Sequence, residues 1–480
     1  MMTKKKAIIL LSAVLIAGGC TMAPKYTKPE SPVAEIWPAG PAYENVLDVD
    51  TEACKGWQDF FTDERLRKVI ETAFENNRDL RLAALNVQQA RGLYGIQRSE
   101  LFPAVNATAN GSKKRTPADL SSSGKAYTSE QYDVNLGIFA WEVDFFGRIR
   151  SLKDQALEQY LATEQAQRSA MILLASSVAD AYLVLAADRE NLALAETTFN
   201  AQKESYDLIK RRFDIGLASE LDLNRAQTQV DIARVDMASY TQMVALDINA
   251  LNLLVGTATP VPEELLPSDL AGVVPLKDIS VGLPSDVLLN RPDIIQAENL
   301  LKAANANIGA ARAALFPRIS LTTSIGTASS ELSGLFDSGQ DTWTFAPGIT
   351  LPIFDARLWS ALDVTKAQKE IAVVQYEKAI QTAFREVSDA LAVRGTVDRQ
   401  ISAQQSLTRA AERTYLLSDK RYKKGIDSYL GVLDAQRSFY SAQQGLVSFQ
   451  LAKLVNQVKF YKVLGGISQY PARGFEGETI

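Results

Sequence analysis

The second half of the chain repeats the first half. Leu101-Phe102-Pro103 recurs about 210 residues later as Leu315-Phe316-Pro317, and Arg212-Phe213-Asp214-Ile215-Gly216 recurs as Arg421-Tyr422-Lys423-Lys424-Gly425. Five further residues recur with the spacing of the first pair, namely Asp79, Ala83, Ala90, Gly95 and Arg98 as Asp293, Ala297, Ala304, Gly309 and Arg312. This duplication predicts two equivalent structural units, which fit a molecule built around an axis better than an enzyme with one pocket.

The composition argues against catalysis. The 480 residues include no histidine, which is the commonest general base, the usual partner in a catalytic triad and a frequent zinc ligand. We therefore expect no enzyme, no metal site and no cofactor. The net charge of −5 is too small to indicate a nucleic-acid partner, and the 46% of apolar residues is ample for a large folded core.

The first 20 residues have the features of a bacterial lipoprotein signal. Lys4-Lys5-Lys6 precedes an apolar stretch from Ala7 to Ala17, and Gly18-Gly19-Cys20 follows it. We expect cleavage before Cys20, a diacylglycerol on its thiol and a palmitate on the mature lipoprotein, although Ala17 stands where such signals usually have Leu. Thr21 after the cysteine resembles signals for the outer membrane. The alternative is an ordinary secretory peptide.

We expect no transmembrane helix in the mature chain, because no later run approaches the roughly 20 apolar residues that a spanning helix needs. If the chain crosses a membrane, it must do so as a β-barrel. Only Cys54 follows Cys20, so an intrachain disulfide would require an unmodified Cys20. The simplest role of Cys54 is that of a small packed side chain.

Two segments have the alternation of β-hairpins. After a helical pattern from Trp57 to about Ser99, apolar and polar residues alternate in two runs of about ten residues, which predicts a hairpin at about 104–143, with the alternation extending to Ala140. A second hairpin is predicted at about 317–353. Such strands have the length that a tilted membrane barrel requires. Trp141 and Trp343 lie near strand ends, where they would either anchor at the membrane interface or pack inside the junction with the helices.

Each predicted hairpin leads into a long helical region without proline, from Ala118 to Thr259 and from Ile353 to Tyr470. A helix from Arg148 to Phe213 would be about 100 Å long and needs lateral helical neighbours. Gly216 and Gly425 stand where each helical run should turn back. A heptad-like seam follows the second turn, formed by Leu433, Tyr440, Val447, Leu451, Leu454, Val458 and Tyr461.

These patterns divide the chain into six segments. They are a signal peptide (1–19), a lipid-anchored extended segment (20–56), a first repeat (57–260), a linker (261–283), a second repeat (284–466) and a C-terminal tail (467–480). Four strands cannot close a transmembrane barrel, because the smallest barrels have eight. Several copies must therefore share one barrel, and three copies would give twelve strands.

The order of these motifs resembles the TolC-type outer-membrane factors, especially the lipidated OprM-like branch of drug-efflux pumps. The resemblance covers Cys20 to about Gly466 and rests on the lipoprotein start, both Leu-Phe-Pro boundaries, the segment Trp141 to Arg148 and the segment Arg421 to Arg437. It implies a mainly α fold with a trimeric twelve-stranded membrane barrel, continued by a long α-helical periplasmic tunnel. It also implies an exit duct for small toxic compounds in the outer membrane, which engages a periplasmic adaptor (membrane fusion) protein and an inner-membrane pump of the resistance-nodulation-division type.

The same resemblance assigns a periplasmic gate to Leu430 and Asp434, and gate-linking contacts between helices to Asp222, Tyr422 and Arg437. Three Asp434 carboxylates about 8 Å apart would repel by about 2 kcal/mol per pair, whereas Leu430 would supply an apolar constriction. One departure is Asp427, where the family has a basic residue that contributes to a link. Without the resemblance, Leu430 is ordinary coiled-coil core and Asp434 a solvated helix residue.

Adaptor contacts are expected at the two turns, which would lie at the periplasmic tip. The candidates are Arg212, Gly216, Leu217, Ser219, Arg421, Gly425, Ile426 and Ser428. The structural alternative for these residues is helix capping.

Other functions remain open at this point. A related conduit would export proteins or metal ions, although the sequence has no His or Met cluster that would favour metals. A lipid-anchored periplasmic coiled-coil adaptor would also have long helices and an anchor at Cys20, but it would not need the two hairpins. A hydrolase lacks support, since no nucleophile arrangement is recognisable.

Overall fold

The computed structural model describes residues 21–43, 56–274, 276 and 285–466. The signal peptide with Cys20, the residue Cys54 and the tail 467–480 lie outside the described residues. The helices are α2 (Trp57–Phe60), α3 (Glu64–Asn76), α4 (Arg78–Ser99), α5 (Arg148–Asp214), α6 (Glu220–Val255), α7 (Pro292–Ala313), α8 (Ala356–Lys423) and α9 (Tyr429–Val463). The strands are β1 (Val105–Thr116), β2 (Tyr127–Val143), β3 (Arg318–Ser329) and β4 (Asp341–Thr350). Short 3₁₀ turns lie at Ala118–Leu120, Glu263–Leu265, Ser285–Asn290 and Leu332–Gly334.

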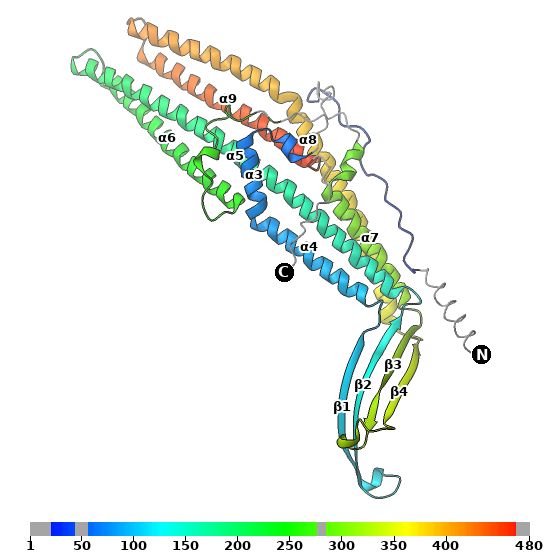
Figure 1. Cartoon of the computed structure of the whole chain (residues 1–480). Coiled ribbons are helices and arrows are strands. Elements are labelled where there is room, and N and C mark those ends of the chain that lie inside the picture. Colours follow the sequence, from blue (N-terminus) through cyan, green and yellow to red (C-terminus); the bar gives the residue numbers. More distant parts are fainter. Residues whose placement is uncertain (1–20, 44–55, 275, 277–284, 467–480) are drawn as a thin grey trace. The chain divides into compact units, whose positions relative to one another are not determined.

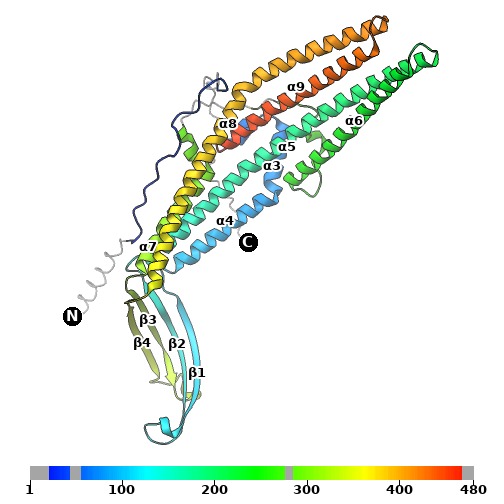
Figure 2. The same ribbon diagram turned by 180° about the vertical axis from the view of Figure 1, so that it is seen from behind.

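The order helix, two strands, two long helices occurs twice (Figures 1 and 2). The helices α4 and α7 each have 22 residues, and α5 and α8 have 67 and 68 residues. The chain forms two compact units that do not coincide with the repeats. The first unit contains residues 1–30, 86–164 and 296–376, and the second contains residues 31–85, 165–295 and 377–480.

The predicted helix from Trp57 to Ser99 is three helices, which corrects the sequence reading. The Asp63 carboxylate accepts hydrogen bonds from the backbone N–H groups of Arg65 and Leu66 and so starts α3. Asn77 has an extended backbone, with ψ of 131°, and its side chain accepts a hydrogen bond from the Leu80 N–H. Polar caps divide this region because a capping side chain satisfies helix-terminal N–H groups that lack a partner in the helix.

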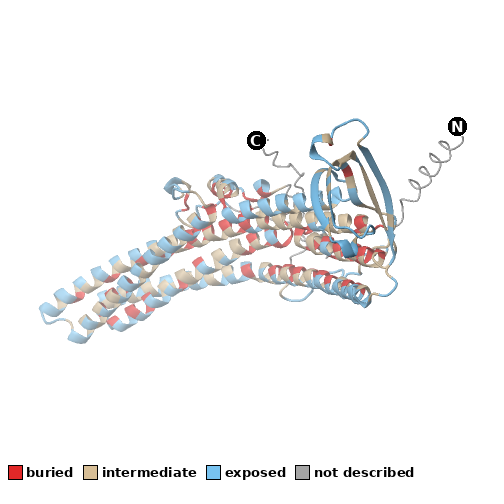
Figure 3. Cartoon of the chain, turned by 90° about the horizontal axis from the view of Figure 1, so that it is seen from below, coloured by how far each residue is buried: buried red, intermediate tan, exposed pale blue. Residues whose placement is uncertain are grey.

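The sequence analysis expected no further stretch that is long and apolar enough to span a membrane, and the structure corrects this expectation. The helix α5 contains a stretch that is long and apolar enough to cross a membrane, and 61% of that stretch is buried inside the chain. Its burial identifies it as the core of the helical unit. Buried residues recur as stripes along the long helices, with exposed residues between them (Figure 3), which is the pattern of helices packed side by side.

The predicted seam of α9 is confirmed, since four of its residues are buried, namely Leu433, Val447, Val458 and Tyr461. The other three, Tyr440, Leu451 and Leu454, are half-buried. The helical hairpins α5–α6 and α8–α9 turn back at Gly216 and Gly425, as predicted, and both glycines have left-handed φ angles of 79° and 72°. A left-handed backbone at this position favours glycine because it has no Cβ.

The first unit contains one antiparallel sheet with the order β1-β2-β3-β4. β2 pairs with β3, so the sheet joins the two hairpins, and β1 and β4 are its edges within the chain. The strands have 12, 17, 12 and 10 residues. The predicted lengths of about ten residues hold for β4 and fall short for the other three strands.

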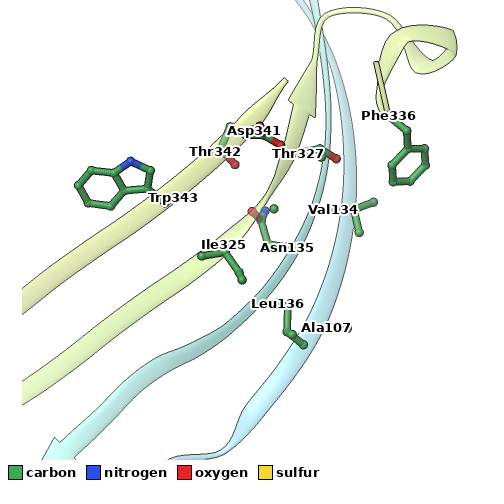
Figure 4. Close-up of a pocket in the computed structure, with 11 residues that line it drawn as sticks. Ala107, Val134, Asn135, Leu136, Ile325, Thr327, Phe336, Asp341, Thr342 and Trp343 are labelled. Atoms are coloured by element: carbon green, nitrogen blue, oxygen red, sulfur yellow. The ribbon is translucent and has the colours of Figure 1, made fainter. Parts of the chain in front are cut away.

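The sheet has one apolar and one polar face, because side chains alternate along each strand and paired residues share a face. The register places Ala107, Leu136, Ile325 and Trp343 in one row on the apolar face. Trp343 is 77% exposed and Ile325 is 65% exposed. Figure 4 shows this row at an apolar hollow that Phe336 also lines. A broad exposed apolar face indicates contact with another apolar phase.

The opposite face is polar. The Asn110 side chain donates to the Asp133 carboxylate over 3.0 Å, and Asn135 donates to the same carboxylate over 2.8 Å. Small residues such as Ser324 and Gly348 complete this face. This division between faces is what a barrel strand requires when one side meets lipid and the other meets water.

The alternation of β2 breaks at a bulge, where the sequence reading was wrong. Ile138 pairs with Thr323 and Trp141 pairs with Leu321, so one extra residue lies between them. Ala140 adopts a positive φ of 56° and donates its N–H to Thr322 Oγ1 over 3.1 Å. The extra residue reverses the alternation. It keeps Trp141 on the apolar face, because an unbroken alternation would turn this side chain to the polar face.

Candidate functional site

The two helical turns at Gly216 and Gly425 have the same hydrogen-bond geometry. Gly216 donates to the Phe213 carbonyl over 2.8 Å, and Leu217 donates to the Arg212 carbonyl over 2.7 Å. In the second turn, Gly425 donates to the Tyr422 carbonyl over 2.8 Å and Ile426 donates to the Arg421 carbonyl over 3.0 Å. Both pairs of bonds form a Schellman motif, in which a left-handed residue ends the helix.

Side chains from both helical hairpins pack together close to these turns. Ile209 of α5, Ala226 of α6 and three α9 residues, Tyr429, Val432 and Leu433, form one buried cluster. Burial raises the pKa of the Tyr429 hydroxyl above its usual value. The cluster fixes the two hairpins side by side in the second unit, so the two turns belong to one surface.

Tyr422 belongs to the edge of this cluster. Its ring centroid lies 5.2 Å from that of Tyr429. The Arg212 guanidinium lies 5.4 Å from the Tyr422 ring centre, at the distance of a cation–π contact. Arg212 and Tyr422 come from different repeats, so this contact joins the two turns.

An exposed face of α9, beside the residues that belong to the cluster, carries the predicted gate residues. Leu430, Asp434 and Arg437 follow one another at four and three residues, and all three are exposed. The Arg437 guanidinium lies 2.5 Å from the Asp434 carboxylate. Asp434 therefore already has a cationic partner in its own chain, which the sequence argument did not foresee. Exposed pairs of this kind contribute little to stability, because water screens them.

The remaining gate-linking candidate, Asp222, lies at the start of α6. Ser219 Oγ donates to the Asp222 carboxylate over 2.7 Å and accepts from the Asp222 N–H over 3.1 Å. This reciprocal arrangement is a helix cap. The structure therefore gives Asp222 and Ser219 a local structural role and places Asp222 in a different turn from Tyr422 and Arg437.

The adaptor candidates differ in whether their side chains are exposed or already bound to another residue of the chain. Leu217 and Ile426 are 72% and 60% exposed. Ser428 precedes α9 but makes no capping bond with its side chain. Arg421, in contrast, is held by Asp427, with N–O distances of 2.5 and 2.9 Å.

Sequence reasoning identified Asp427 only as a departure from the basic residue of the family pattern. The structure shows that it closes the second turn through Arg421, and the hydrogen bonds from this guanidinium hold the pKa of Asp427 below its usual value. The two residues are six positions apart. A spacing of six is not a helical pair, so only the geometry of the turn brings the two side chains together.

An acidic pair on α5 and α6 was also missed. Burial, together with the neighbouring Asp188 carboxylate, raises the pKa of Asp247 to about 6. Asp188 and Asp247 lie in long helices, and in the sequence neither can be distinguished from an ordinary exposed polar residue. Elsewhere, among residues 21–43, 56–274, 276 and 285–466, no group of three or more Asp, Glu, Cys or His side chains is arranged to hold a metal ion.

Known proteins match the chain along nearly its whole length. The family described as outer membrane efflux protein matches residues 69–257 and 283–466. A probable efflux pump outer membrane protein, TtgC of Pseudomonas putida, is 49% identical over 468 residues, which cover 96% of each chain. The outer membrane protein OprJ of Pseudomonas aeruginosa is 40% identical over 475 residues, again 96% of each chain.

Solved structures agree with these relatives. The open state of the MtrE outer membrane channel of Neisseria gonorrhoeae is 39% identical, with a TM-score of 0.83 over 93% of this chain and 98% of that one. The CmeC outer membrane channel of Campylobacter jejuni is 26% identical, with a TM-score of 0.85 over 93% and 95% of the two chains.

The predictions of family, fold class, outer-membrane location, efflux function and partners are thereby confirmed. Three copies share the barrel, and the helices continue it as a tunnel toward a periplasmic adaptor and an inner-membrane pump. A free-standing coiled-coil adaptor is excluded, because the sheet and the relatives both belong to a membrane channel. The chain belongs to the outer membrane efflux protein family, as the outer-membrane channel subunit of an efflux pump.

Proposed function

We propose that the trimer is a passive exit duct for small apolar toxic compounds, and that Leu430 and Asp434 close it at the periplasmic end. The cargo is inferred from relatives that are 48–49% identical to the chain and are named for toluene, solvent and antibiotic efflux. These names favour small organic compounds over proteins or metal ions. The proposed role requires neither catalysis nor a cofactor.

The exposure of Leu430 carries the gate proposal. Leu430 is 45% exposed at the start of α9, although the neighbouring Tyr429 and Val432 are buried in the cluster. Its exposed side chain is therefore available for contact with the equivalent side chains of the other two copies. Three such side chains converging on an axis would supply a narrow apolar constriction that resists wetting.

The contact between Arg437 and Asp434 supports a gate that opens at low energetic cost. Their side chains are 60% and 67% exposed, so the ion pair within one chain is weak. Arg437 can therefore exchange Asp434 for an acceptor in a neighbouring copy without losing a strong interaction. We propose that Asp222 and Tyr422 take part in such links between copies, in addition to their contacts within the chain.

We further propose that the two turns form the docking surface for the adaptor. Leu217 and Ile426 are equivalent in the two repeats and both largely exposed, which suits an adaptor that recognises the same motif twice. Replacing both with Asp should abolish capture of the purified adaptor while the trimer stays intact. If capture is unchanged, Leu217 and Ile426 only take part in ending their helices and do not contact the adaptor.

We propose that Cys20 carries the lipid anchor. Mass spectrometry of the mature protein should show an N-terminal Cys20 with diacylglycerol and a fatty acid, and Cys20→Ser should remove both. An unmodified N-terminus at another residue would contradict the proposal.

Single-channel conductance in a planar bilayer tests the gate. The wild type should have a small conductance, and Leu430→Ala should increase it several-fold because it widens the constriction. Leu221 is the matched control, since it is equivalent to Leu430 in the first repeat and is 58% exposed. Leu221→Ala should change the conductance much less, and equal effects of the two variants would refute a gate at Leu430.

Ion selectivity tests the charge at the gate. Asp434→Ala leaves Arg437 without its carboxylate partner, so the local field becomes more positive and selectivity should shift toward anions. The double variant Asp434→Ala with Arg437→Ala should return selectivity toward that of the wild type. A selectivity that is the same in all three proteins would place this pair away from the conduction path.

A further inference from the structure

The β1–β2 hairpin extends farther from the helices than the β3–β4 hairpin does (Figure 1). β2 pairs with β3 from Tyr132, opposite Ser329, whereas its pairing with β1 starts five residues earlier. The segments 112–116 and 127–131 therefore form a two-stranded extension of about 17 Å, which we call the outer ribbon. Because the helices leave the opposite end of the strands toward the periplasm, the outer ribbon lies at the outer side of the membrane.

Two aromatic residues bound the apolar face of β2. Tyr132 shares this face with Leu136, and the bulge keeps Trp141 on it. A Cβ at Gly111 would lie 3.2 Å from the Tyr132 ring, so the ring lies over β1 on this side of the sheet. From Tyr132 to Trp141, β2 runs about 30 Å, or about 23 Å across a membrane at a tilt of about 40°. This height is close to the ~25 Å apolar band of a barrel, so the two aromatic residues mark its boundaries.

Two cations lie on the same face directly beyond Tyr132. Side chains two residues apart share a face, so Lys113 and Arg115 lie on the apolar side of the sheet and Lys114 lies on the polar side. The Lys113 side chain is 68% exposed and forms an ion pair with Glu130 across the two strands. The Tyr132 hydroxyl donates to the same Glu130 carboxylate over 3.1 Å. These contacts confirm that Lys113 and Tyr132 share a face.

Arg115 is the free cation of this face. Among the residues that the structure describes, none forms a hydrogen bond or an ion pair with the exposed Arg115 side chain. Glu130 is already bound to Lys113, so the lipid-facing side of the outer ribbon has a net charge of about +1. A guanidinium binds a phosphate through two parallel hydrogen bonds. Its place just beyond the apolar band is the level at which the headgroups of outer-leaflet lipids lie.

An apolar hollow lies on the same face, on the membrane side of these cations (Figure 4). Trp343 and Phe336 at this hollow are 77% and 78% exposed. Ala107 also lines it and precedes Lys113 on β1 by six residues, about 20 Å along the strand and about 15 Å across the membrane. That depth is half of the hydrocarbon core of about 30 Å. A lipid whose phosphate lies at Arg115 can therefore lay an acyl chain across the hollow.

We propose that the lipid-facing side of the outer ribbon binds a phosphorylated glycolipid of the outer leaflet. Arg115 binds the phosphate, Lys113 adds the second positive charge, and an acyl chain passes Tyr132 to reach the hollow at Trp343. The continuity of the cations with the apolar band favours a lipid over a soluble anion, because the occupant must be apolar next to its phosphate. The proposal goes beyond the duct, the gate and the adaptor surface and does not depend on them.

Native mass spectrometry of the detergent-solubilised trimer, titrated with bisphosphorylated lipid A, tests the phosphate site. Arg115→Gln should raise the apparent Kd several-fold, and Arg115→Gln with Lys113→Gln should raise it more than tenfold. The matched control is Lys114→Gln, which removes the same charge from the same segment but on the polar face, and it should leave the Kd unchanged. Equal weakening by the control, or an unchanged Kd in the double variant, would overturn the proposal.

The choice of ligand separates a lipid site from an anion site. Dephosphorylated lipid A should bind the wild type about as weakly as bisphosphorylated lipid A binds the double variant. Inorganic phosphate at the same concentration should not displace lipid A, and displacement would show a site for soluble anions instead. Trp343→Ser should weaken both lipids by the same factor, because it removes an apolar contact. An unchanged affinity in Trp343→Ser would exclude the hollow from the site.

The competing role for Arg115 is an ion pair with Asp341 of a neighbouring copy, since Asp341 begins β4 on the same face. In that case Arg115→Gln and Asp341→Asn would both lower the Tm of the trimer in detergent without lipid, and lipid A would stabilise the wild type and Arg115→Gln equally. This result would refute the proposal. We expect instead that Arg115→Gln has the Tm of the wild type without lipid A and a lower Tm with it, because a ligand stabilises only the protein that binds it.

Discussion

The helices α4 and α7 have the same length and related sequences, yet α7 is enclosed within its chain and α4 is largely exposed. The difference does not come from helix propensity, because both form 22-residue helices. It comes from their neighbours within the chain, since α7 lies against α5 and the N-terminal segment Thr21 to Glu30 (the strap), whereas a Cβ at Gly95 of α4 would meet nothing within 4 Å. The duplicated sequence thus forms the same helix in both repeats, and the fold of the chain decides which of the two helices is covered.

The residue before each of these helices donates a side-chain hydrogen bond to an equivalent carbonyl, but the two residues differ. The Asn77 amide donates to the Leu254 carbonyl over 2.8 Å, and the equivalent Arg291 donates to the equivalent Val463 carbonyl over 2.8 Å. Arg291 also pairs with Asp293 and Glu386 over 2.7 and 2.9 Å and is 8% exposed. One repeat therefore uses a neutral cap where the other uses a buried cation with two carboxylates.

The largest difference between the repeats should appear when these anchors are removed. Arg291→Ala should destabilise the protein by about 3 kcal/mol, because it leaves two carboxylates without their cation. Asn77→Ala should cost about 1 kcal/mol, the usual loss for a cap. Thermal unfolding of the detergent-solubilised trimer measures both values. Equal losses would mean that the carboxylates find solvent and that the two anchors are energetically alike.

A smaller difference is expected from side chains added at the equivalent glycines. Gly309→Val should displace the strap, because even a Cβ would meet the Ala23 backbone at 2.6 Å, at a cost of about 1–3 kcal/mol. Limited trypsin digestion at Lys25 should then become several-fold faster. Gly95→Val is the comparison, and it should leave cleavage at Lys25 unchanged, because a Cβ at Gly95 would meet nothing within 4 Å. Accelerated cleavage in both variants would show that the strap is released by any destabilisation of the protein and not by the contact at Gly309.

The smallest effect is a pH dependence confined to the first repeat. Asp247 has a folded pKa of about 6, above the usual value of about 3.9, so the folded chain holds a proton that the unfolded chain has lost between these values. Stability should therefore rise by about 1 kcal/mol as the pH falls from 7 to 5, after allowance for partial exposure.

The second repeat supplies the control for this titration. The residue equivalent to Asp247 is Asn456, which is buried and donates to the Ala390 carbonyl over 3.1 Å. Asp247→Asn should reduce the pH dependence to the part that Asp180 contributes, whose pKa burial also raises to about 6, and should stabilise the protein at pH 7. If the variant keeps the same profile in unfolding experiments at pH 5 and 7, the titrating group lies elsewhere.

Local rules predicted much of the candidate site. Gly216 and Gly425 were recognisable as helix ends because their conformation needs a residue without Cβ, and the seam of α9 was recognisable from its period. The Arg421–Asp427 pair was not recognisable, because a spacing of six residues has no meaning until the turn is built. The in-chain partner of Asp434 was recognisable in principle, because Arg437 follows it by three residues on α9, which is the spacing of a helical pair.

The sequence by itself determined the duplication, the four strands, the long paired helices and the positions of the two turns. These properties follow from periodicity and from backbone restrictions, which act over a few residues. The tertiary structure alone decided the bulge at Ala140, where a residue other than glycine takes a positive φ to keep Trp141 on the apolar face. It also decided the role of Gly309, because its close approach to Ala23 and Ser151 depends on segments that are distant in the chain.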